Sequence, residues 1–347
     1  MIFVGDIAIP YKGSMIFKDF PESLKNKKWF GNLEGAITNK GNSKVNAVYN
    51  DYLAMQNLIS QFDFVGLALA NNHILDLGDI SETEAFLDLN KINYCGLGRT
   101  KEECERVVVI EEGNESIVIL NFGWEVIQCE VFKKDNEIGV TPLRKEYAIS
   151  RVQEVIKEYP KSKIVTFMHW SYELESEPQP LERDLAHYLI DLGVEAVIGC
   201  HPHCVGGVEF YKDKPIVYSL GNWMFKQGYY FDGKLNFPDR CNIQLAFELD
   251  FEHNLCRFHL FEYDKLKSTI SYLGTEEKNS FDYIGLKTPY NEFNSKEYQR
   301  WYKKNHFHKN KGLPIFYWND SKLTYKLKVS FVNYRDKMLK LFLNKGK

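Results

Sequence analysis

The chain has 347 residues, 44% of them hydrophobic, which is enough for one large domain or two medium ones around a sizeable core. Its formal net charge of −3 gives no argument for nucleic acid as a partner of the whole molecule, so any charge-driven contact must be regional. Seven cysteines without a CxxC pair favour a reducing compartment over a disulfide framework. Since no leader precedes the first apolar run and no run approaches the roughly 20 residues that cross a bilayer, we expect a cytoplasmic protein.

Short apolar runs alternate with amphipathic stretches through the first two thirds of the chain. The runs predict strands at residues 2–5, 63–69, 116–122, 163–170, 195–199 and 215–220. Helical periodicity predicts helices at residues 52–61, 80–89 and 181–192, and Ser81 with Glu84 indicates a capping box on the second of them. This alternation of strands and helices predicts an α/β fold.

The pattern changes from about Asn242 onward. Two β-rich runs, IQLAFELDF and CRFHLFEY, predict an antiparallel pair that closes a catalytic domain of residues 1–265. Residues 266–347 then form a C-terminal extension that is polar, aromatic and basic. From Lys287 to the end it holds 15 Lys/Arg against 4 Asp/Glu, a net charge of about +11. Its last 22 or so residues carry apolar side chains at mixed helical spacing.

The extension allows two interpretations. It packs over the catalytic domain, or it contacts a partner or the inner face of an acidic membrane, because aromatic rings suit the interface and Lys/Arg attract anionic lipid. The aromatic residues concerned are Trp301, Tyr302, Phe307, Phe316, Tyr317 and Trp318. No nucleic-acid-reading motif accompanies the charge, so we expect no nucleic acid here.

Polar side chains able to bind metals follow the apolar runs: Asp6, Glu34, Asn72, His73, His169, His201 and His203. Because the carboxyl ends of strands in an α/β sheet line the crevice where ligands bind, we expect these residues to converge. In the stretch GCHPHCVGG, His201 and His203 stand two residues apart, so in an extended segment they share one face. Carboxylate, amide oxygen and imidazole together suit Mn, Fe or Zn.

Each of these residues also has a structural interpretation on its own. His169 alone could be a hydrogen-bonded strand-end residue, Asp6 a turn residue, Glu34 a solvated one, and GCHPH an ordinary turn. Cys200 and Cys204 could complete a structural zinc site with the histidines, but the chain has no second cysteine pair, which favours a packing role for them. The metal hypothesis therefore depends on the whole set meeting in one place.

The ordered motifs NLEGAIT, LANNHILDLG, YCGLGR, FMHWSYE, LIDLGVEAVIGCHPH and GVEFYKDKPIVYSLGNW, spanning about residues 1–225, resemble those of the bacterial capsule synthesis proteins of the CapA type, which are named for poly-γ-glutamate synthesis. That family resembles the calcineurin-like metallophosphoesterases. The resemblance implies a four-layer α/β/β/α sandwich that holds one or two divalent ions. It implies metal ligands at Asp6, Glu34, Asn72, His169, His201 and His203, catalytic roles for His73 and Asp76, and substrate-binding or supporting roles for Asn32, Glu173 and Asn222.

One position departs from the metallophosphoesterase pattern. Where Asp-x-His is usual, residue 8 is Ala8, so one ligand of the first metal is missing, as in the capsule branch generally. The resemblance implies a cytoplasmic phosphomonoester hydrolase that acts on a phosphorylated sugar, polyol or nucleotide-linked intermediate of surface polysaccharide synthesis, in contact with other capsule-synthesis enzymes. Two alternatives stay open. The same metal centre could hydrolyse or handle poly-γ-glutamate amide bonds, or the protein could be an assembly scaffold with a vestigial metal site.

Overall fold

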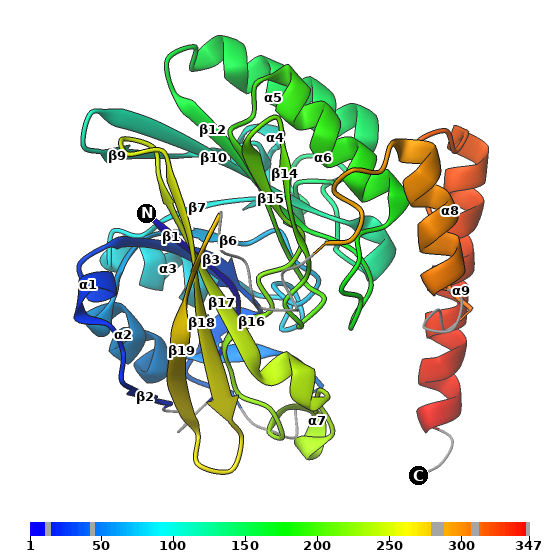
Figure 1. Ribbon diagram of the computed structural model, residues 1–347. Helices are drawn as coiled ribbons and strands as arrows, with labels where there is room; N and C mark the ends of the chain where they lie inside the picture. The colour runs from blue at the N-terminus through cyan, green and yellow to red at the C-terminus, as the bar shows by residue number, and fades with distance from the viewer. Residues whose placement is uncertain (11–14, 42–45, 279–287, 307–311, 345–347) are drawn as a thin grey trace.

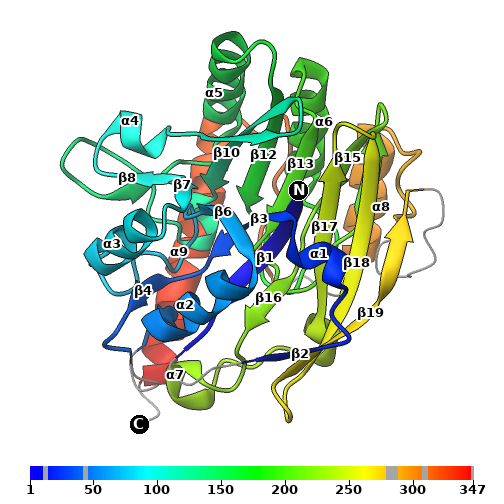
Figure 2. The ribbon, with the colours of Figure 1, turned by 90° about the vertical axis from the view of Figure 1, so that its left-hand side faces the viewer.

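Two β-sheets pack face to face, and helices cover the outer face of each (Figures 1 and 2). The computed structural model describes residues 1–10, 15–41, 46–278, 288–306 and 312–344, with side chains up to residue 339. The predicted four-layer α/β/β/α sandwich is thereby confirmed.

The first sheet has the strand order β2-β19-β18-β17-β1-β3-β6-β7, and β16 also pairs with β1. Its strands are β1 (Ile2–Ala8), β2 (Ile16–Lys18), β3 (Lys28–Leu33), β6 (Asp63–Ala68), β7 (Asn93–Cys95), β16 (Asn222–Phe225), β17 (Ile243–Asp250), β18 (Leu255–Asp264) and β19 (Thr269–Glu277). The short helix α1 (Glu22–Lys25) and the helices α2 (Tyr52–Gln61) and α3 (Ser81–Leu89) lie along it.

The second sheet has the order β14-β15-β13-β12-β10-β9. Its strands are β9 (Val108–Glu112), β10 (Glu115–Gly123), β12 (Lys163–His169), β13 (Ala196–Cys200), β14 (Val208–Tyr211) and β15 (Lys214–Val217). Helices α5 (Lys145–Glu158) and α6 (Pro180–Leu192) cover its outer face (Figure 1). The remaining elements are β4 (Ala36–Thr38), β5 (Tyr49–Asp51), β8 (Leu97–Gly98), β11 (Gly139–Val140), α4 (Lys101–Cys104), α7 (Tyr230–Gly233), α8 (Ser295–His306), α9 (Lys322–Asn344) and two short 3₁₀ turns, η1 (Glu125–Ile127) and η2 (Asp239–Asn242).

The alternation of side chains along each strand explains why the layers hold together. On β1, Phe3 points between the sheets while Ile2 and Val4 join the outer cluster under the helices. The inner face meets its partner directly, since the rings of Phe30 on β3 and Phe167 on β12 lie 5.5 Å apart. Strands buried on both faces read as continuous apolar runs, which is why the runs were visible in the sequence.

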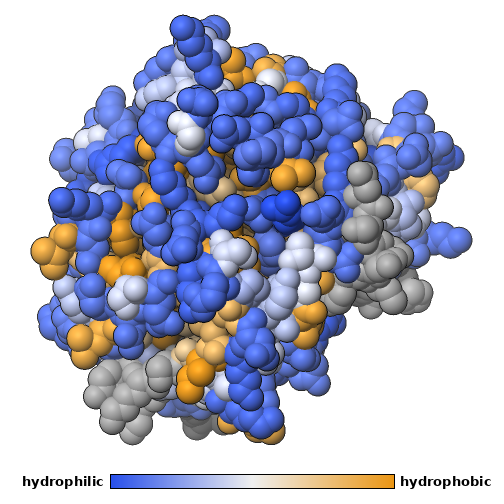
Figure 3. Space-filling view, turned by 60° about the vertical axis from the view of Figure 1, so that its left-hand side comes forward, coloured by the Kyte–Doolittle hydropathy of each residue, from blue (hydrophilic) through white to orange (hydrophobic). Residues whose placement is uncertain are grey.

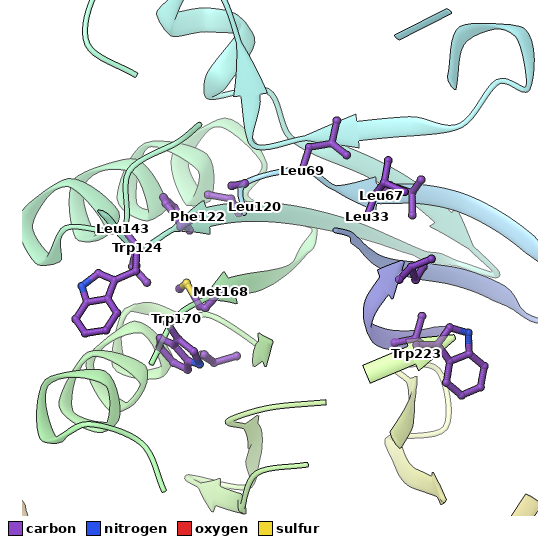
Figure 4. Packing of buried hydrophobic residues seen from close by; sticks show 14 of the residues in the cluster. Leu33, Leu67, Leu69, Leu120, Phe122, Trp124, Leu143, Met168, Trp170 and Trp223 are labelled. Atoms are coloured by element: carbon purple, nitrogen blue, oxygen red, sulfur yellow. The ribbon is translucent and has the colours of Figure 1, made fainter. Parts of the chain in front are cut away.

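The outer cluster is seen in part in Figure 4, where Leu120, Phe122 and Met168 lie on strands of the second sheet and Trp124 and Trp170 follow at their ends. Each of these large side chains is nearly or fully buried. Burying one such side chain contributes roughly 1.5–3 kcal/mol to folding. The exposed surface is different: on the face shown in Figure 3 it is mostly hydrophilic, with apolar residues in small groups.

Two sequence-based expectations about local structure are wrong. Ser81 does not cap α3, because its hydroxyl donates to Asp79 Oδ2 (3.0 Å) and Ile80 occupies the cap position without a side-chain bond. The predicted antiparallel pair is present as β17 and β18, but the sheet does not end with it. β19 pairs with β18 over residues 269–277 and β2 pairs with β19, so the expected domain boundary at residue 265 falls inside the first sheet.

The described part of the C-terminal extension packs against α6. Arg183 donates through Nε to Glu209 Oε2 (3.0 Å) and through Nη2 to the carbonyl oxygens of Tyr290 (3.1 Å) and Phe293 (2.9 Å). Tyr302 and Phe316 are fully buried, and Trp301, Tyr317 and Trp318 are half-buried. These aromatic residues therefore take part in packing, and Phe307 lies outside the described residues.

Glu182, at the start of α6, gives a testable pH dependence of stability. It is buried, and its Oε2 accepts from the backbone N–H of Gln179 (2.8 Å). Burial raises its pKa to about 8. Because the pKa of Glu182 is higher in the folded state than in the unfolded state, folding takes up a proton. The contribution of neutral Glu182 to the free energy of unfolding is therefore complete below about pH 4.5 and is lost as the pH rises toward 8.

We expect Glu182→Gln, which keeps the acceptor oxygen and removes the ionisation, to be more stable than the wild type at pH 8–9 by on the order of 1–4 kcal/mol, at about 1.4 kcal/mol per pKa unit. Near pH 4.5 the variant and the wild type should have similar free energies of unfolding. Urea unfolding at several pH values measures the difference, and a difference that does not grow with pH would contradict the assignment.

Candidate metal centre

The parallel strands bring the predicted ligands to one edge of the two sheets. β1, β3 and β6 run parallel in the first sheet and β12 and β13 in the second. Asp6 lies near the end of β1, Glu34 follows β3 and His169 ends β12. Asn72 and His73 come shortly after β6, and His201 and His203 come directly after β13. The spacing of the apolar runs thus fixes where these side chains meet.

Glycine makes the position of Asp6 possible. A Cβ at Gly5 would stand 1.8 Å from the carbonyl oxygen of Gly221. Because this position has none, the backbone of β1 comes close enough for the Asp6 N–H to donate to Gly221 O (3.1 Å). The approach brings Asp6 beside Asn222, its register partner on β16.

One group of candidate ligands is formed by Asp6, Glu34 and His203, whose ligand atoms all lie within 4.8 Å of one another. Asp6 Oδ2 stands 3.4 Å from His203 Nδ1 and accepts from the backbone N–H of His201 (3.1 Å). The other oxygen, Oδ1, accepts from Asn32 Nδ2 (2.9 Å). His203 Nε2 lies 3.8 Å from Glu34 Oε1. Asp6 is thus held by donors that orient both of its oxygens.

A second group is formed by Glu34, His169 and His201, with ligand atoms within the same 4.8 Å. The imidazole rings of His169 and His201 are 4.8 Å apart. His169 Nε2 faces Asn72 Oδ1 (2.7 Å), which brings the predicted amide ligand into the same place. Glu34 belongs to both groups, so its carboxylate occupies the position of a group that could bridge two ions.

The two histidines of GCHPH reach the centre in a different way from the one expected. His201 has φ of +96° and His203 of +60°, so the segment is a tight turn and not an extended strand. Both values lie in the left-handed region, which is unfavourable for residues other than glycine and is found mainly where the surroundings enforce it. The turn nevertheless brings both rings to the centre, with ring centroids 5.8 Å apart.

Burial sets the charge state of the centre. It raises the pKa of Asp6 and raises the pKa of Glu34 well above its usual value, where the charges of Asp6, Glu173 and Asp76 add to the effect. Burial and the neighbouring imidazoles lower the pKa of His169 and His201 well below the usual value. Neutral imidazole is the form that binds metals, whereas the two carboxyl groups, whose pKa values are raised, would release protons when a cation binds.

His73 is held at the edge of the centre by Asp76. Its Nδ1 lies 2.7 Å from Asp76 Oδ2, which also accepts from the backbone N–H of Val48 (2.9 Å). The opposite ring nitrogen, Nε2, lies 3.8 Å from Glu34 Oε1. Because Asp76 accepts the proton of Nδ1, Nε2 is turned toward the centre, where it can take up or release a proton.

The remaining predicted residues differ in position. Asn222 Oδ1 accepts from His203 Nδ1 (2.9 Å), which directs Nε2 of that ring toward Glu34. Asn32 supports Asp6 as described. Glu173 is exposed and lies at the rim of a cleft of about 760 Å³ that opens onto Asn72 and His201. The structure thus gathers all the predicted residues except Glu173 into one cluster.

Two features of the site, Asn71 and the wall formed by α9, were missed in the sequence, and Cys200 was considered as a ligand but assigned to packing. Asn71, beside the predicted Asn72, is buried and donates to Asn32 Oδ1 (3.2 Å) and Leu33 O (2.8 Å). Cys200 Sγ lies 3.2 Å from His169 Nδ1, and it forms a further ligand group with Asp6 and His169 in addition to packing. The helix α9 contributes Val332, Arg335, Asp336 and Leu339 to the wall of the cleft. The tandem asparagine of LANNH offered a signal for Asn71 and the cysteines beside the histidines offered one for Cys200, whereas α9 had none.

The residues fit a divalent cation. Among the residues that the structure describes, neither carboxylate oxygen of Glu34 nor Nδ1 of His201 has a hydrogen-bonding partner, although all three atoms are buried. A buried carboxylate without a donor is costly, and a cation at this point would remove the cost. Ala8 occupies the place of the missing histidine and packs with Val48 and Phe225, so residue 8 supplies no ligand.

Comparison with known proteins is consistent with this arrangement. The model of the family described as bacterial capsule synthesis protein PGA_cap matches residues 3–227. The PGA biosynthesis protein CapA of Bacillus subtilis (strain 168) is 28% identical over 175 residues, which cover 50% of this chain and 45% of that protein. The capsule biosynthesis protein CapA of Bacillus anthracis is 25% identical over 238 residues, covering 65% and 57%. The chain thus spans about half the length of the curated relatives it matches.

A solved structure of the protein TT1561 from Thermus thermophilus superposes with a TM-score of 0.40 at 9% identity, covering 74% of this chain and 96% of that one. This likeness is remote. Helices long and apolar enough to cross a membrane do not occur in the described part of the chain.

Proposed function

The chain belongs to the family of bacterial capsule synthesis proteins, PGA_cap, and on this premise we propose that it is a metal-dependent hydrolase that cleaves the γ-glutamyl amide bonds of poly-γ-glutamate. The observation that carries the proposal is Glu34. Its buried carboxylate lacks a hydrogen-bond donor within the described structure and belongs to two groups of metal ligands, one of which contains His201, a residue that lines the cleft.

The expectation of a phosphomonoester hydrolase for a sugar, polyol or nucleotide-linked intermediate is wrong. The curated relatives are named for PGA and capsule biosynthesis, and these names favour the poly-γ-glutamate alternative. The error arose because the ligand set is the same for both reactions: a centre of carboxylates and imidazoles can activate water toward phosphorus or toward a carbonyl.

The residues of this chain would have two kinds of role, metal binding and proton transfer. Asp6, Glu34, Asn72, His169, His201 and His203 would hold one or two divalent ions, with Mn, Fe and Zn as the candidates. A divalent ion at this place supplies Lewis-acid chemistry, which polarises a carbonyl and makes water a stronger nucleophile. His73, held by Asp76, would take up a proton at Nε2 from the attacking water and pass it to the nitrogen that leaves. The reaction adds water across the C–N bond: the hydroxyl joins the acyl carbon and the proton joins the nitrogen, so that the products are one carboxylate and one ammonium group.

The cleft has features that suit such a polymer. Arg240 and Arg335 are part of its lining, and guanidinium groups pair with carboxylates in a bidentate manner. Each unit of poly-γ-glutamate carries one free α-carboxylate beside its γ-amide bond.

The proposal is tested with the full chain, stripped of metal by a chelator and reloaded separately with Mn²⁺, Fe²⁺ or Zn²⁺. We expect poly-γ-glutamate to become shorter by size-exclusion chromatography and new amines to appear, with at least one of the metals. Poly-α-glutamate is the matched control, because it has the same charge per residue and differs in the bond. It should remain intact.

Two other results would overturn the proposal in distinct ways. Tight binding of the polymer without shortening would identify a handling protein. A protein that holds no metal after gentle purification, and takes up none when the ions are supplied, would identify an assembly scaffold with a vestigial site.

A further inference from the structure

The helix α9 has two faces with different surroundings. On the inner face, Tyr325 OH accepts from Trp124 Nε1 (3.1 Å), Val332 is buried, and Asp336 Oδ2 accepts from Gln128 Nε2 (2.9 Å). This face is therefore fixed to the domain and forms part of the cleft wall. Figures 1 and 2 show α9 running along one side of the molecule.

The outer face carries a stripe of exposed apolar side chains. Leu323, Leu327, Phe331 and Tyr334 are 69%, 62%, 51% and 65% exposed. Steps of four, four and three residues place them on one side of a helix, over about three turns. Single exposed apolar residues are ordinary on a protein surface, but a continuous row of large ones marks a contact surface.

The charges beside this apolar stripe are positive. Lys326 and Lys337 are exposed and lie along one edge of it, at helical positions adjacent to Leu327 and Tyr334. The one acidic residue in the described part of α9 is Asp336, which is turned to Gln128 on the inner face. The outer face thus combines an apolar row with a cationic border along one edge.

We propose that the apolar stripe of α9 lies on an anionic lipid bilayer. A helix of 23 residues with a cationic polar border and apolar side chains on the other face is suited to lie in the plane of the interface, with its apolar side in the headgroup region. Each Lys near an anionic surface contributes attraction that increases the affinity by about fivefold. The proposal is independent of the reaction catalysed at the metal centre.

A second copy of the chain fits the stripe less well. Pairing two α9 helices through this face would bring Lys326 and Lys337 of one copy against the lysines of the other, without an acidic residue on that face, among the described residues, to separate them. Like charges directly opposed across an interface are unfavourable. On a bilayer the same lysines face phosphate and carboxylate groups.

Binding would also place the cleft at the bilayer. Because the inner face of α9 forms part of the cleft wall, a bilayer that contacts the outer face lies one helix diameter, about 10 Å, from the cleft. The metal centre would then act on chains close to the membrane surface.

The experiment is co-sedimentation of the full chain with vesicles of phosphatidylcholine alone or mixed with phosphatidylserine. We expect binding to the mixed vesicles that weakens with added salt. Leu327→Asp with Phe331→Asp should weaken it at least about tenfold, and Lys326→Glu with Lys337→Glu by a similar factor. Leu53→Asp, at a leucine of α2 that is 66% exposed, is the matched control and should bind like the wild type.

Circular dichroism and hydrolysis in solution show that each variant is folded, since none of these residues lies in the metal centre. The proposal is overturned if the wild type fails to bind mixed vesicles, or if Leu53→Asp weakens binding as much as the α9 variants do. Sedimentation velocity tests whether a second copy occupies the stripe instead. A wild-type dimer that becomes a monomer in the variant Leu327→Asp with Phe331→Asp would identify a second copy as the occupant.

Discussion

Glu34→Gln is expected to lose divalent metal and to lower the rate of polymer cleavage by roughly 10³-fold or more. The variant keeps the shape of the side chain but removes the negative charge that both ligand groups share. A bound ion supplies several kcal/mol of charge stabilisation, and each 1.36 kcal/mol corresponds to a factor of about ten in rate. Elemental analysis after reloading and size-exclusion chromatography of the polymer measure the two effects.

The stability of the metal-free protein separates this role from a structural one. Burial raises the pKa of Glu34 well above its usual value, so ionised Glu34 costs stability in the absence of a cation. The cost grows as pH rises from the unfolded pKa toward the folded one. Metal-free Glu34→Gln should therefore be as stable as the metal-free wild type at low pH and more stable at about pH 8. A variant less stable at every pH would contradict the role.

Glu173→Gln is the matched control for this experiment. Glu173 is a carboxylate of the same length at the rim of the same cleft, but it is exposed and belongs to neither ligand group. We expect this variant to retain metal. If both variants lost metal equally, the general negative potential of the cleft, and not the position of Glu34, would explain the binding.

The convergence of the candidate ligands could be predicted from sequence because each of them follows, or stands at, the end of a buried strand. Asp6 and His169 stand at the ends of apolar runs that are typical of buried β-strands. Parallel pairing of the strands brings such ends together, however long the chain segment that connects them. The backbone of GCHPH could not be predicted in the same way. The left-handed conformations of His201 and His203 depend on packing against Asp6 and Asn222, which are distant in sequence.

The contribution of the C-terminal extension to the cleft wall could not be predicted from the sequence, for a different reason. The mixed helical spacing of apolar residues over 322–343 is compatible with a helix, but it does not tell which part of the molecule that helix will contact. Arg335 lies in the same cleft wall as His201, 134 positions earlier in the chain. The bond from Trp124 Nε1 to Tyr325 OH that helps to fix this contact leaves no local pattern.

His73→Gln is expected to lower turnover by roughly 10²–10⁴-fold while leaving the metal content unchanged, because general acid–base groups contribute about this factor. His73 is held through Nδ1 by Asp76 (2.7 Å), and its Nε2 is directed to the centre 3.8 Å from Glu34 Oε1, so it is placed to transfer a proton rather than to bind the ion. The loss should be smaller with a γ-glutamyl p-nitrophenyl ester, because the nitrophenolate leaves without being protonated. Asp76→Asn should show the same pattern to a lesser degree, since it keeps the shape of the contact and removes the charge that fixes the imidazole tautomer. If His73→Gln released the metal, or slowed both substrates equally, His73 would be a ligand or a positioning residue instead of the proton donor.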